Sequence, residues 1–395
     1  MTTPDTLSAH DRLTFGTSMV DWERRIDFAK LRRDRLARTR RAMSDAGVDF
    51  LLLSRVENAR YATGIKRLYW PTIRLGAGPL VVQPQEGDPA IWITDPDYAA
   101  ETLEWVPRDR FRDGPEMELD TDVRWFVKDL LEMHPEAATA TIGVDVWSPV
   151  MHDLLPELLP HAKLVDGQAV MYEARKTKTF EEIQCLKMAY VISEAGMQAA
   201  YEILRPGVRE SELVGAALKR FWDFGSETTQ CSENVNSGPG TFPYRRFHTD
   251  RIVQWGDFVN MDFGACFNGY FGDFCRGFVA GDKPTTAQLD IMKRAYDAQM
   301  SIVEHLKPGI RPKDVADKVG FNHLGHGFGI AAFEAPHLRV PYDDYVIEPG
   351  MTFAIGSPTS IGSRELGCIH NEDQVYITET GCVRYSTYGY PGVDF

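Results

Sequence analysis

Two aspartates lie on either side of a predicted β-hairpin in the second half of the chain. Residues 258–278 contain two strand-like runs that flank Asn268-Gly269, a dipeptide typical of two-residue hairpin turns. Counting outward from this turn pairs Gly264 with Asp273 and places Asp262 diagonally across from Asp273, with the backbones about 7–8 Å apart. Carboxylates that converge in this way either share a cation or perturb each other's pKa. A pair of surface aspartates without a ligand is the alternative.

Two further residues with ligand chemistry follow. His326 lies in the glycine-rich run 325–329, where another backbone segment or a ligand can approach closely. Glu372 lies near the start of a strand-like run at 371–377. Two aspartates, a histidine and a glutamate supply the mixed oxygen and nitrogen donors of a metal site. The sequence therefore predicts a metal centre formed by Asp262, Asp273, His326 and Glu372.

The composition excludes several classes of partner. Lys and Arg number 43 against 57 Asp and Glu, a net charge of −14, whereas binding to nucleic acid or an anionic membrane needs a basic face. No apolar run reaches the about 18 residues of a membrane span, and the first residues lack the features of a signal peptide. The six cysteines include no C-x-x-C pair, which argues against a disulfide framework. We expect a cytoplasmic protein that binds neither nucleic acid nor membrane.

The elements that must position these residues fall into two domains. Apolar periodicity predicts, in the first half of the chain, helices over 27–46, 122–132 and 150–158 and strands over 48–53, 80–83 and 90–94. Thr179 and Glu182 then form the capping box of a long helix. We therefore divide the chain into domains at 1–170 and 171–395.

The second domain contains an internal repeat. Leu204-Arg-Pro-Gly-Val-Arg209 recurs as Leu306-Lys-Pro-Gly-Ile-Arg311, and a helical run precedes each copy. Two similar halves predict a pseudo-twofold domain with a cleft between the halves.

Together these features resemble the creatinase/prolidase/methionine aminopeptidase superfamily, peptidase family M24. The resemblance rests on Lys178-x-x-x-Glu182-Ile183, the spacing of 11 between Asp262 and Asp273, Gly-His-Gly-Phe-Gly at 325–329, Glu348-Pro349-Gly350-Met351 and Glu372-Asp373. It implies an α+β fold class: an N-terminal creatinase-like α/β domain followed by a pseudo-twofold pita-bread catalytic domain. It also implies a homodimer.

The resemblance fails at several positions of the site. The family's two-metal site uses five ligands, and Gly356 stands where the fifth, a glutamate, is expected. The resemblance therefore implies either a more weakly held divalent ion (Fe, Mn, Co or Zn) or no metal. Tyr244 and Phe333 stand where the peptidases have two histidines that hold the peptide.

Three residues are candidate catalytic groups. His326 would act as a metal ligand or in acid–base catalysis. Glu334 is the acid nearest to the base expected from the resemblance, and it is either a base or nucleophile or a structural carboxylate before Pro336. His323 is either a second imidazole at the site or a buried, hydrogen-bonded histidine.

A second set of residues could bind a small zwitterion. Tyr69, Trp70 and Arg74 lie in a segment that reaches into the partner's cleft in creatinase-like dimers, and aromatic rings with an arginine suit a cation and a carboxylate. Ordinary domain packing is the alternative. Tyr244 and Arg245, with Arg246 beside them, could also bind a substrate carboxylate.

Short stretches also resemble two non-peptidase branches of the superfamily. Residues 60–63, 237–239 and 372–375 resemble the dimethylsulfoniopropionate lyases, and 251–254 resemble creatinase. We therefore predict a non-peptidase enzyme that cleaves a small zwitterionic or carboxylate-bearing molecule by hydrolysis or elimination. A divergent Xaa-Pro-type metallopeptidase and a catalytically inactive binding module are the alternatives.

Overall fold

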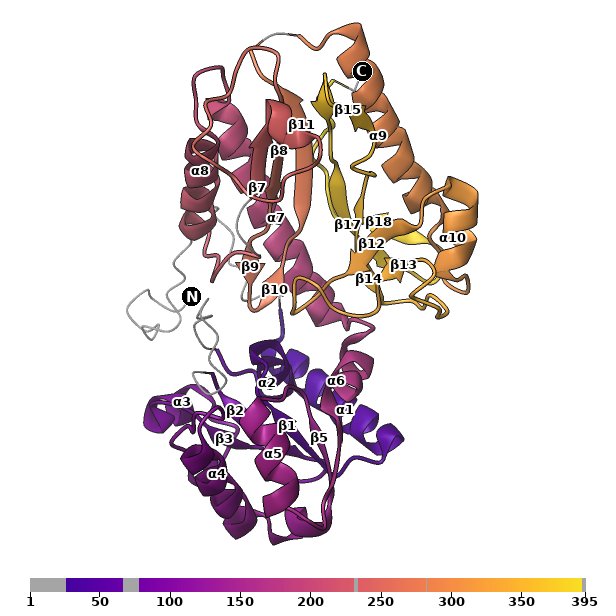
Figure 1. Ribbon diagram of the computed structural model, residues 1–395. Coiled ribbons are helices and arrows are strands. Elements are labelled where there is room, and N and C mark those ends of the chain that lie inside the picture. The colour runs from indigo at the N-terminus through magenta and orange to yellow at the C-terminus, as the bar shows by residue number, and fades with distance from the viewer. Residues whose placement is uncertain (1–25, 67–77, 231–233, 282, 393–395) are drawn as a thin grey trace, which may run out of the picture.

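The structure is a computed structural model that describes residues 26–66, 78–230, 234–281 and 283–392. Figure 1 shows an N-terminal part in indigo and magenta and a C-terminal part in magenta to yellow. Helix α7 (Phe180–Ile203) opens the second part, with the predicted capping box of Thr179 and Glu182. The predicted α+β fold, with an N-terminal α/β domain and a pita-bread domain, is confirmed. Within these ranges no helix is long and apolar enough to cross a membrane.

A six-stranded sheet forms the centre of the N-terminal domain, in the order β4-β3-β2-β1-β5-β6. Every residue of β1 is buried, as its apolar run predicts. Helix α1 begins after Asp27, whose side chain accepts a hydrogen bond from Lys30 N, and ends at Gly47, where φ is 65°. The strands are β1 (Phe50–Leu53), β2 (Leu80–Pro84), β3 (Ala90–Trp92), β4 (Phe111–Arg112), β5 (Thr141–Val144) and β6 (Lys163–Asp166). The helices are α1 (Phe28–Ala46), α2 (Val56–Thr63), α3 (Pro96–Thr102), α4 (Asp120–Met133), α5 (Pro149–Leu158) and α6 (Gly167–Arg175), with short 3₁₀ turns at Arg108–Arg110 and Pro135–Thr139.

A sheet of eight strands forms the centre of the C-terminal domain. Seven follow the order β13-β12-β14-β17-β11-β8-β7, and β18 pairs with β17. They are β7 (Asn234–Ser237), β8 (Phe258–Phe263), β11 (Phe274–Val279), β12 (His323–Gly327), β13 (Leu338–Arg339), β14 (Thr352–Gly356), β17 (Glu372–Ile377) and β18 (Cys382–Arg384). Two short ribbons pair β9 (Cys266–Phe267) with β10 (Tyr270–Phe271) and β15 (Gly362–Ser363) with β16 (Gly367–Cys368). The remaining helices are α8 (Glu210–Asp223), α9 (Thr286–His305) and α10 (Pro312–Val319), with a 3₁₀ turn at Gly238–Thr241.

The internal repeat is confirmed as two matching helix–turn–helix units. Gly207 follows α7 with φ 93°, and Gly309 follows α9 with φ 86°. The amide of Gly207 donates to Val253 O, and that of Gly309 donates to Ile347 O. Figure 1 shows α8 beside β7 on one side of the domain and α9 and α10 on the other. Each half of the domain therefore supplies its own helices and strands, as the repeat predicts.

A buried ion pair ties the end of the N-terminal domain to the loop after β12. Lys178 Nζ lies 2.7 Å from Glu334 Oε1, and Arg175 Nε lies 3.4 Å from Glu334 Oε2. All three side chains are at most 2% exposed. The predicted domain boundary between residues 170 and 171 falls inside α6, which packs against α1, and it remains a prediction.

Candidate metal centre

The hairpin that carries the two aspartates has the register counted from the sequence. Asn268 and Gly269 have φ angles of 48° and 83°, the left-handed pair that a two-residue turn of this kind requires. Tyr270 pairs with Phe267 in the β9–β10 ribbon, and Cys275 pairs with Asp262 in the β8–β11 ladder, which continues the same count. Asp273 therefore lies opposite Gly264 and diagonal to Asp262, as predicted.

Segments from both halves of the domain bring three ligand atoms together. Asp273 Oδ2 lies 3.2 Å from His326 Nε2, and Glu372 Oε1 lies 3.7 Å from the same nitrogen. All three side chains are buried, and one ligand atom from each lies within 4.8 Å of the others. The glycines around His326 permit this approach, because a Cβ at Gly325 would overlap Ala354 O on β14. Two carboxylates and an imidazole fit a divalent ion such as Mn, Fe, Co or Zn.

The tautomer of His326 suits a ligand. Its Nδ1 lies 3.2 Å from Gly327 O, so Nδ1 carries the proton and Nε2 turns its lone pair toward the two carboxylates. Burial lowers the pKa of His326 and keeps the ring neutral. The ring of Phe333 stacks on the imidazole, with 4.0 Å between centroids and 27° between planes. The imidazole is therefore fixed in both tautomer and orientation.

Asp262, the fourth predicted ligand, lies beside this group but is held differently. Its Oδ2 accepts hydrogen bonds from Asn234 Nδ2 and Tyr244 Oη, each at 3.4 Å. Burial and the charge of Glu372 raise the pKa of Asp262 to about 6. The structure therefore brings Asp273, His326 and Glu372 together and leaves Asp262 at their edge.

His370 fills the space next to Gly356. A Cβ built on Gly356 would lie 2.6 Å from His370 Cε1. His370 Nδ1 lies 2.8 Å from Ser357 O, and its Nε2 lies 3.4 Å from Glu372 Oε2. Burial opposes ionisation of Glu372, but the hydrogen bond and charge of His370 lower its pKa to about 2. From the sequence, His370 could line the cleft, but a solvated or structural place is favoured. Its spacing of two from Glu372 nevertheless places both side chains on one face of an extended segment.

The structure places the two remaining predicted catalytic residues differently. Glu334 is 1% exposed and paired with Lys178, so it supports the structural alternative rather than the catalytic one. His323 is exposed and lies on the wall of the cleft that contains His326. The alternative that His323 is a buried, hydrogen-bonded histidine is therefore wrong.

The predicted carboxylate-binding residues also separate. Arg245 pairs with the buried Glu210, and that pairing corrects its predicted role in substrate binding. Tyr244 turns its hydroxyl to Asp262. Arg246, beside them, lines the cleft instead. Tyr69, Trp70 and Arg74 lie outside the described residues.

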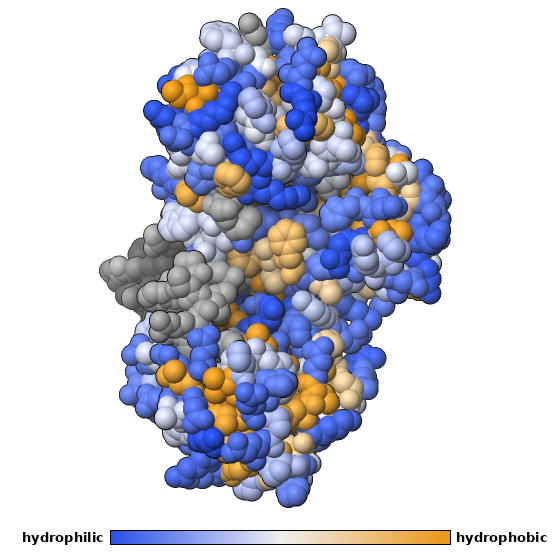
Figure 2. Space-filling view, viewed as in Figure 1, coloured by the Kyte–Doolittle hydropathy of each residue, from blue (hydrophilic) through white to orange (hydrophobic). Residues whose placement is uncertain are grey.

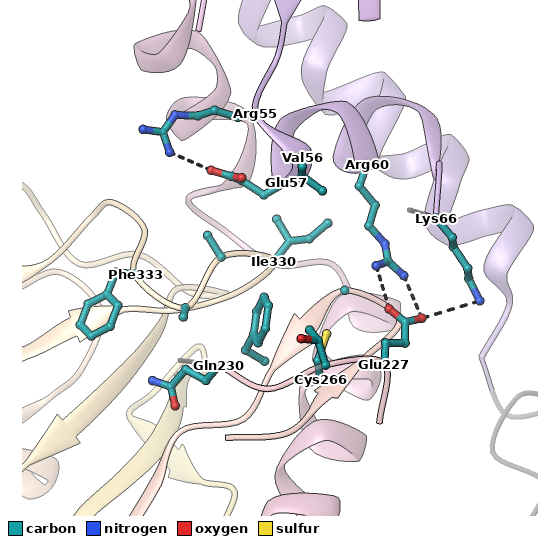
Figure 3. Close-up of a pocket in the computed structure, with 15 residues that line it drawn as sticks. Arg55, Val56, Glu57, Arg60, Lys66, Glu227, Gln230, Cys266, Ile330 and Phe333 are labelled. Carbon is teal, nitrogen blue, oxygen red and sulfur yellow. Dashed lines mark hydrogen bonds and ion pairs between the residues drawn. The ribbon is translucent and has the colours of Figure 1, made fainter. Parts of the chain in front are cut away.

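Two cavities meet at Phe333. One, of about 800 Å³, is the cleft that contains His326, Glu372 and His370. The other, of about 600 Å³, lies between the domains, and Figure 2 shows the surface hollowed there. In Figure 3, Arg60 and Lys66 both reach Glu227 on the wall of this second cavity. The charged side chains of this second cavity in Figure 3 form ion pairs with one another. The first cavity instead contains the candidate metal ligands His326 and Glu372.

Comparison with known proteins identifies both domains. Residues 35–177 match the creatinase/prolidase N-terminal domain, and residues 184–379 match metallopeptidase family M24. The Xaa-Pro dipeptidase of Pyrococcus furiosus is 26% identical over 89% of this chain and 97% of its own length. An uncharacterized peptidase of Bacillus subtilis, YqhT, is 27% identical over 88% of this chain and 96% of its own.

Solved structures share the fold. The prolidase of Pyrococcus horikoshii OT3 superposes with a TM-score of 0.73 at 22% identity, covering 91% of this chain and 100% of its own. A Xaa-Pro dipeptidase from Bacillus anthracis gives 0.74 at 21% identity, covering 91% and 98%. Because the relatives that match along nearly the whole chain are peptidases, the prediction of a non-peptidase hydrolase or lyase is wrong. Gly356, Tyr244 and Phe333 are therefore departures from the expected residues in a chain whose matched relatives are peptidases.

Proposed function

Because the chain belongs to the creatinase/prolidase superfamily of metallopeptidase family M24, we propose that it is a metal-dependent peptidase that hydrolyses Xaa-Pro dipeptides. The observation that carries the proposal is the convergence of Asp273, His326 and Glu372, of which His326 and Glu372 line a cleft. The matched Xaa-Pro dipeptidases support the substrate class.

Three side chains would hold the divalent ion. Asp273 and Glu372 supply anionic oxygens and His326 supplies a neutral nitrogen, and Asp262 lies beside them as a further carboxylate. Such an ion polarises a carbonyl and lowers the pKa of water. The β12–β14 and β14–β17 pairings hold His326 and Glu372 in place. The chain must also bind the substrate in the cleft.

Arg246 is the residue we assign to the substrate's carboxylate. Burial acts to lower its pKa, but electrostatic attraction to Tyr244, Glu372 and Asp262 raises it overall, so the guanidinium stays a cation. It lies 5.4 Å from the centroid of the Tyr244 ring and makes no hydrogen bond or ion pair with another described side chain. A dipeptide carries its carboxylate one residue from the scissile bond, where an arginine of the same cleft can pair with it.

Phe333 provides the apolar surface of the cleft. Its ring is 56% exposed while it stacks on His326, so one face holds the imidazole and the other is free for a proline ring or an apolar side chain. The predicted homodimer, and any contribution of Tyr69, Trp70 and Arg74 across it, remain part of this proposal.

Hydrolysis of Xaa-Pro dipeptides with added Mn²⁺ or Co²⁺ tests the function. We expect the purified chain to cleave Ala-Pro and Met-Pro, and the Asp273→Asn variant to lose that activity. The same dipeptides with an amidated C-terminus test whether Arg246 binds the substrate's carboxylate. The Arg246→Gln variant should raise KM for the free acid and not for the amide. Metal-loaded protein that leaves every Xaa-Pro dipeptide intact would overturn the proposal.

A further inference from the structure

We infer that this centre takes a single divalent ion, because the imidazole of His370 occupies the place beside Glu372 and Asp262 that a second ion would need. The inference rests on the metal centre of the proposed function and extends it to the number of ions. Three observations support it: the contacts of Glu372, the hydrogen bonds to Asp262, and the lack of room for a side chain at position 356.

The two oxygens of Glu372 already face different partners. Oε1 lies 3.7 Å from His326 Nε2, inside the group of three ligand atoms, whereas Oε2 lies 3.4 Å from His370 Nε2. A carboxylate bridges two ions by giving one oxygen to each. Here one oxygen faces the metal group and the other faces an imidazole.

His370 is locked in this place. Its Nδ1 lies 2.8 Å from Ser357 O, its backbone amide donates to Asn260 Oδ1 at 2.8 Å, and its carbonyl accepts from Cys275 Sγ at 3.2 Å. The ring is 5.0 Å from that of Tyr244, edge to face, and the residue is 5% exposed. Both ring nitrogens adjoin oxygen acceptors, so the ring presents an N–H rather than a ligand lone pair to Glu372.

The carboxylate of Asp262 also has hydrogen-bond partners already. Asn234 Nδ2 and Tyr244 Oη both donate to its Oδ2. Both hydrogen bonds fall on Oδ2, so a second ion that used this oxygen would have to displace the two donors as well as the imidazole. The position of Asp262 therefore supports a hydrogen-bonding role instead of ligation.

Gly356 completes the argument from the opposite strand. It pairs with Glu372 across β14 and β17, so a side chain there would enter the same space, and its Cβ would lie 2.6 Å from His370 Cε1. A ligand at 356 and the observed ring of His370 exclude each other. His370 is thus a positioning residue that holds Glu372 for one ion.

Metal counting on the intact chain tests the inference without relying on catalysis. Metal-free protein is equilibrated by dialysis against MnCl₂, the bound Mn²⁺ is counted by mass spectrometry, and its electron paramagnetic resonance spectrum is recorded. We expect one equivalent at saturation and the six-line spectrum of an isolated Mn²⁺. Two equivalents with an exchange-coupled spectrum, or no bound Mn²⁺, overturn the inference.

Variants test the role of His370. The double variant Gly356→Glu/His370→Gly restores a carboxylate and clears the space, so it should bind a second equivalent and show exchange coupling. His370→Gly alone clears the space without adding a ligand and should stay at one equivalent, as should His152→Ala, a histidine removed from an exposed site on α5. A double variant that folds and stays at one equivalent overturns the inference, and so does a second equivalent in the His152→Ala control.

The same samples separate this inference from the proposed function. One bound Mn²⁺ without Xaa-Pro hydrolysis contradicts the function and leaves the metal count standing. Hydrolysis with two bound ions contradicts the count and leaves the function standing.

Discussion

Replacing Glu334 by glutamine distinguishes a carboxylate that stabilises the fold from one that takes part in chemistry. Oε1 lies 2.7 Å from Lys178 Nζ and Oε2 lies 3.4 Å from Arg175 Nε, with both partners almost fully buried. Glutamine keeps an oxygen for Lys178 but removes the negative charge, so two buried cations are left without their counter-ion.

The expected cost follows from that burial. Removing one partner of a buried ion pair costs about 3–5 kcal/mol, and the retained hydrogen bond to Lys178 places this variant near the lower value, about 3 kcal/mol. Total stabilities lie around 5–15 kcal/mol, so the loss is large. The matched control is Glu348→Gln, whose carboxylate is 47% exposed and lies 3.2 Å from Lys176. That variant should lose less than about 1 kcal/mol.

Urea denaturation followed by tryptophan fluorescence gives both unfolding free energies, and Xaa-Pro hydrolysis is measured on the same preparations. We expect the Glu334→Gln variant to lose activity only in proportion to its unfolded fraction. An unchanged unfolding free energy together with a kcat reduced by about 100-fold, the scale of a lost general base, would refute the structural role.

Three further predictions concern the site and the N-terminal domain. Asp273→Asn removes one of three converging ligands and should weaken Mn²⁺ binding, measured by calorimetry, by at least about tenfold. Even mutation of a residue that only supports a ligand lowers metal affinity about 10–100-fold. Unchanged affinity would show that Asp273 is no ligand. Arg246→Gln should raise KM for a Xaa-Pro dipeptide by about tenfold or more, the value of a charged hydrogen bond, and an equal rise for the amidated dipeptide would contradict the assignment. Burial raises the pKa of Asp145 to about 6, above its ordinary 3.8, so the folded chain binds this proton more tightly than the unfolded chain and stability falls as pH rises. Relative to Asp145→Asn, the wild type should lose about 2 kcal/mol between about pH 4.5 and pH 7, and denaturation curves with a pH-independent difference would contradict this.

The hairpin of the site could be predicted residue by residue because its register is set locally. Asn268-Gly269 fixes the turn, and counting from it gives the facing positions of Gly264 and Asp273. His326 and Glu372 could be proposed from residue type and from the resemblance, although the sequence alone contains no distance between them.

The rest of the site depends on contacts between distant segments. Glu334 meets Lys178 across 156 positions of sequence, and no local pattern distinguishes that carboxylate from a catalytic one. His370 lies against Gly356 only because β14 and β17 pair. In the sequence, departures such as Gly356 indicate a loss of peptidase chemistry, whereas the structure shows the space beside Gly356 filled by His370, just before β17.

The central place of β17 has a consequence for the order in which the chain folds. β17 lies between β14 and β11, so it joins the two halves of the sheet. Its residues, 372–377, follow all of its sheet neighbours except β18 in the sequence, and during synthesis β11 and β14 therefore await their shared partner with unpaired edges. The last strand of the N-terminal sheet, β6, ends at Asp166, so this sheet can fold first. Glu372 arrives with the strand that closes the sheet, so assembly of the metal centre and completion of the catalytic domain are one event.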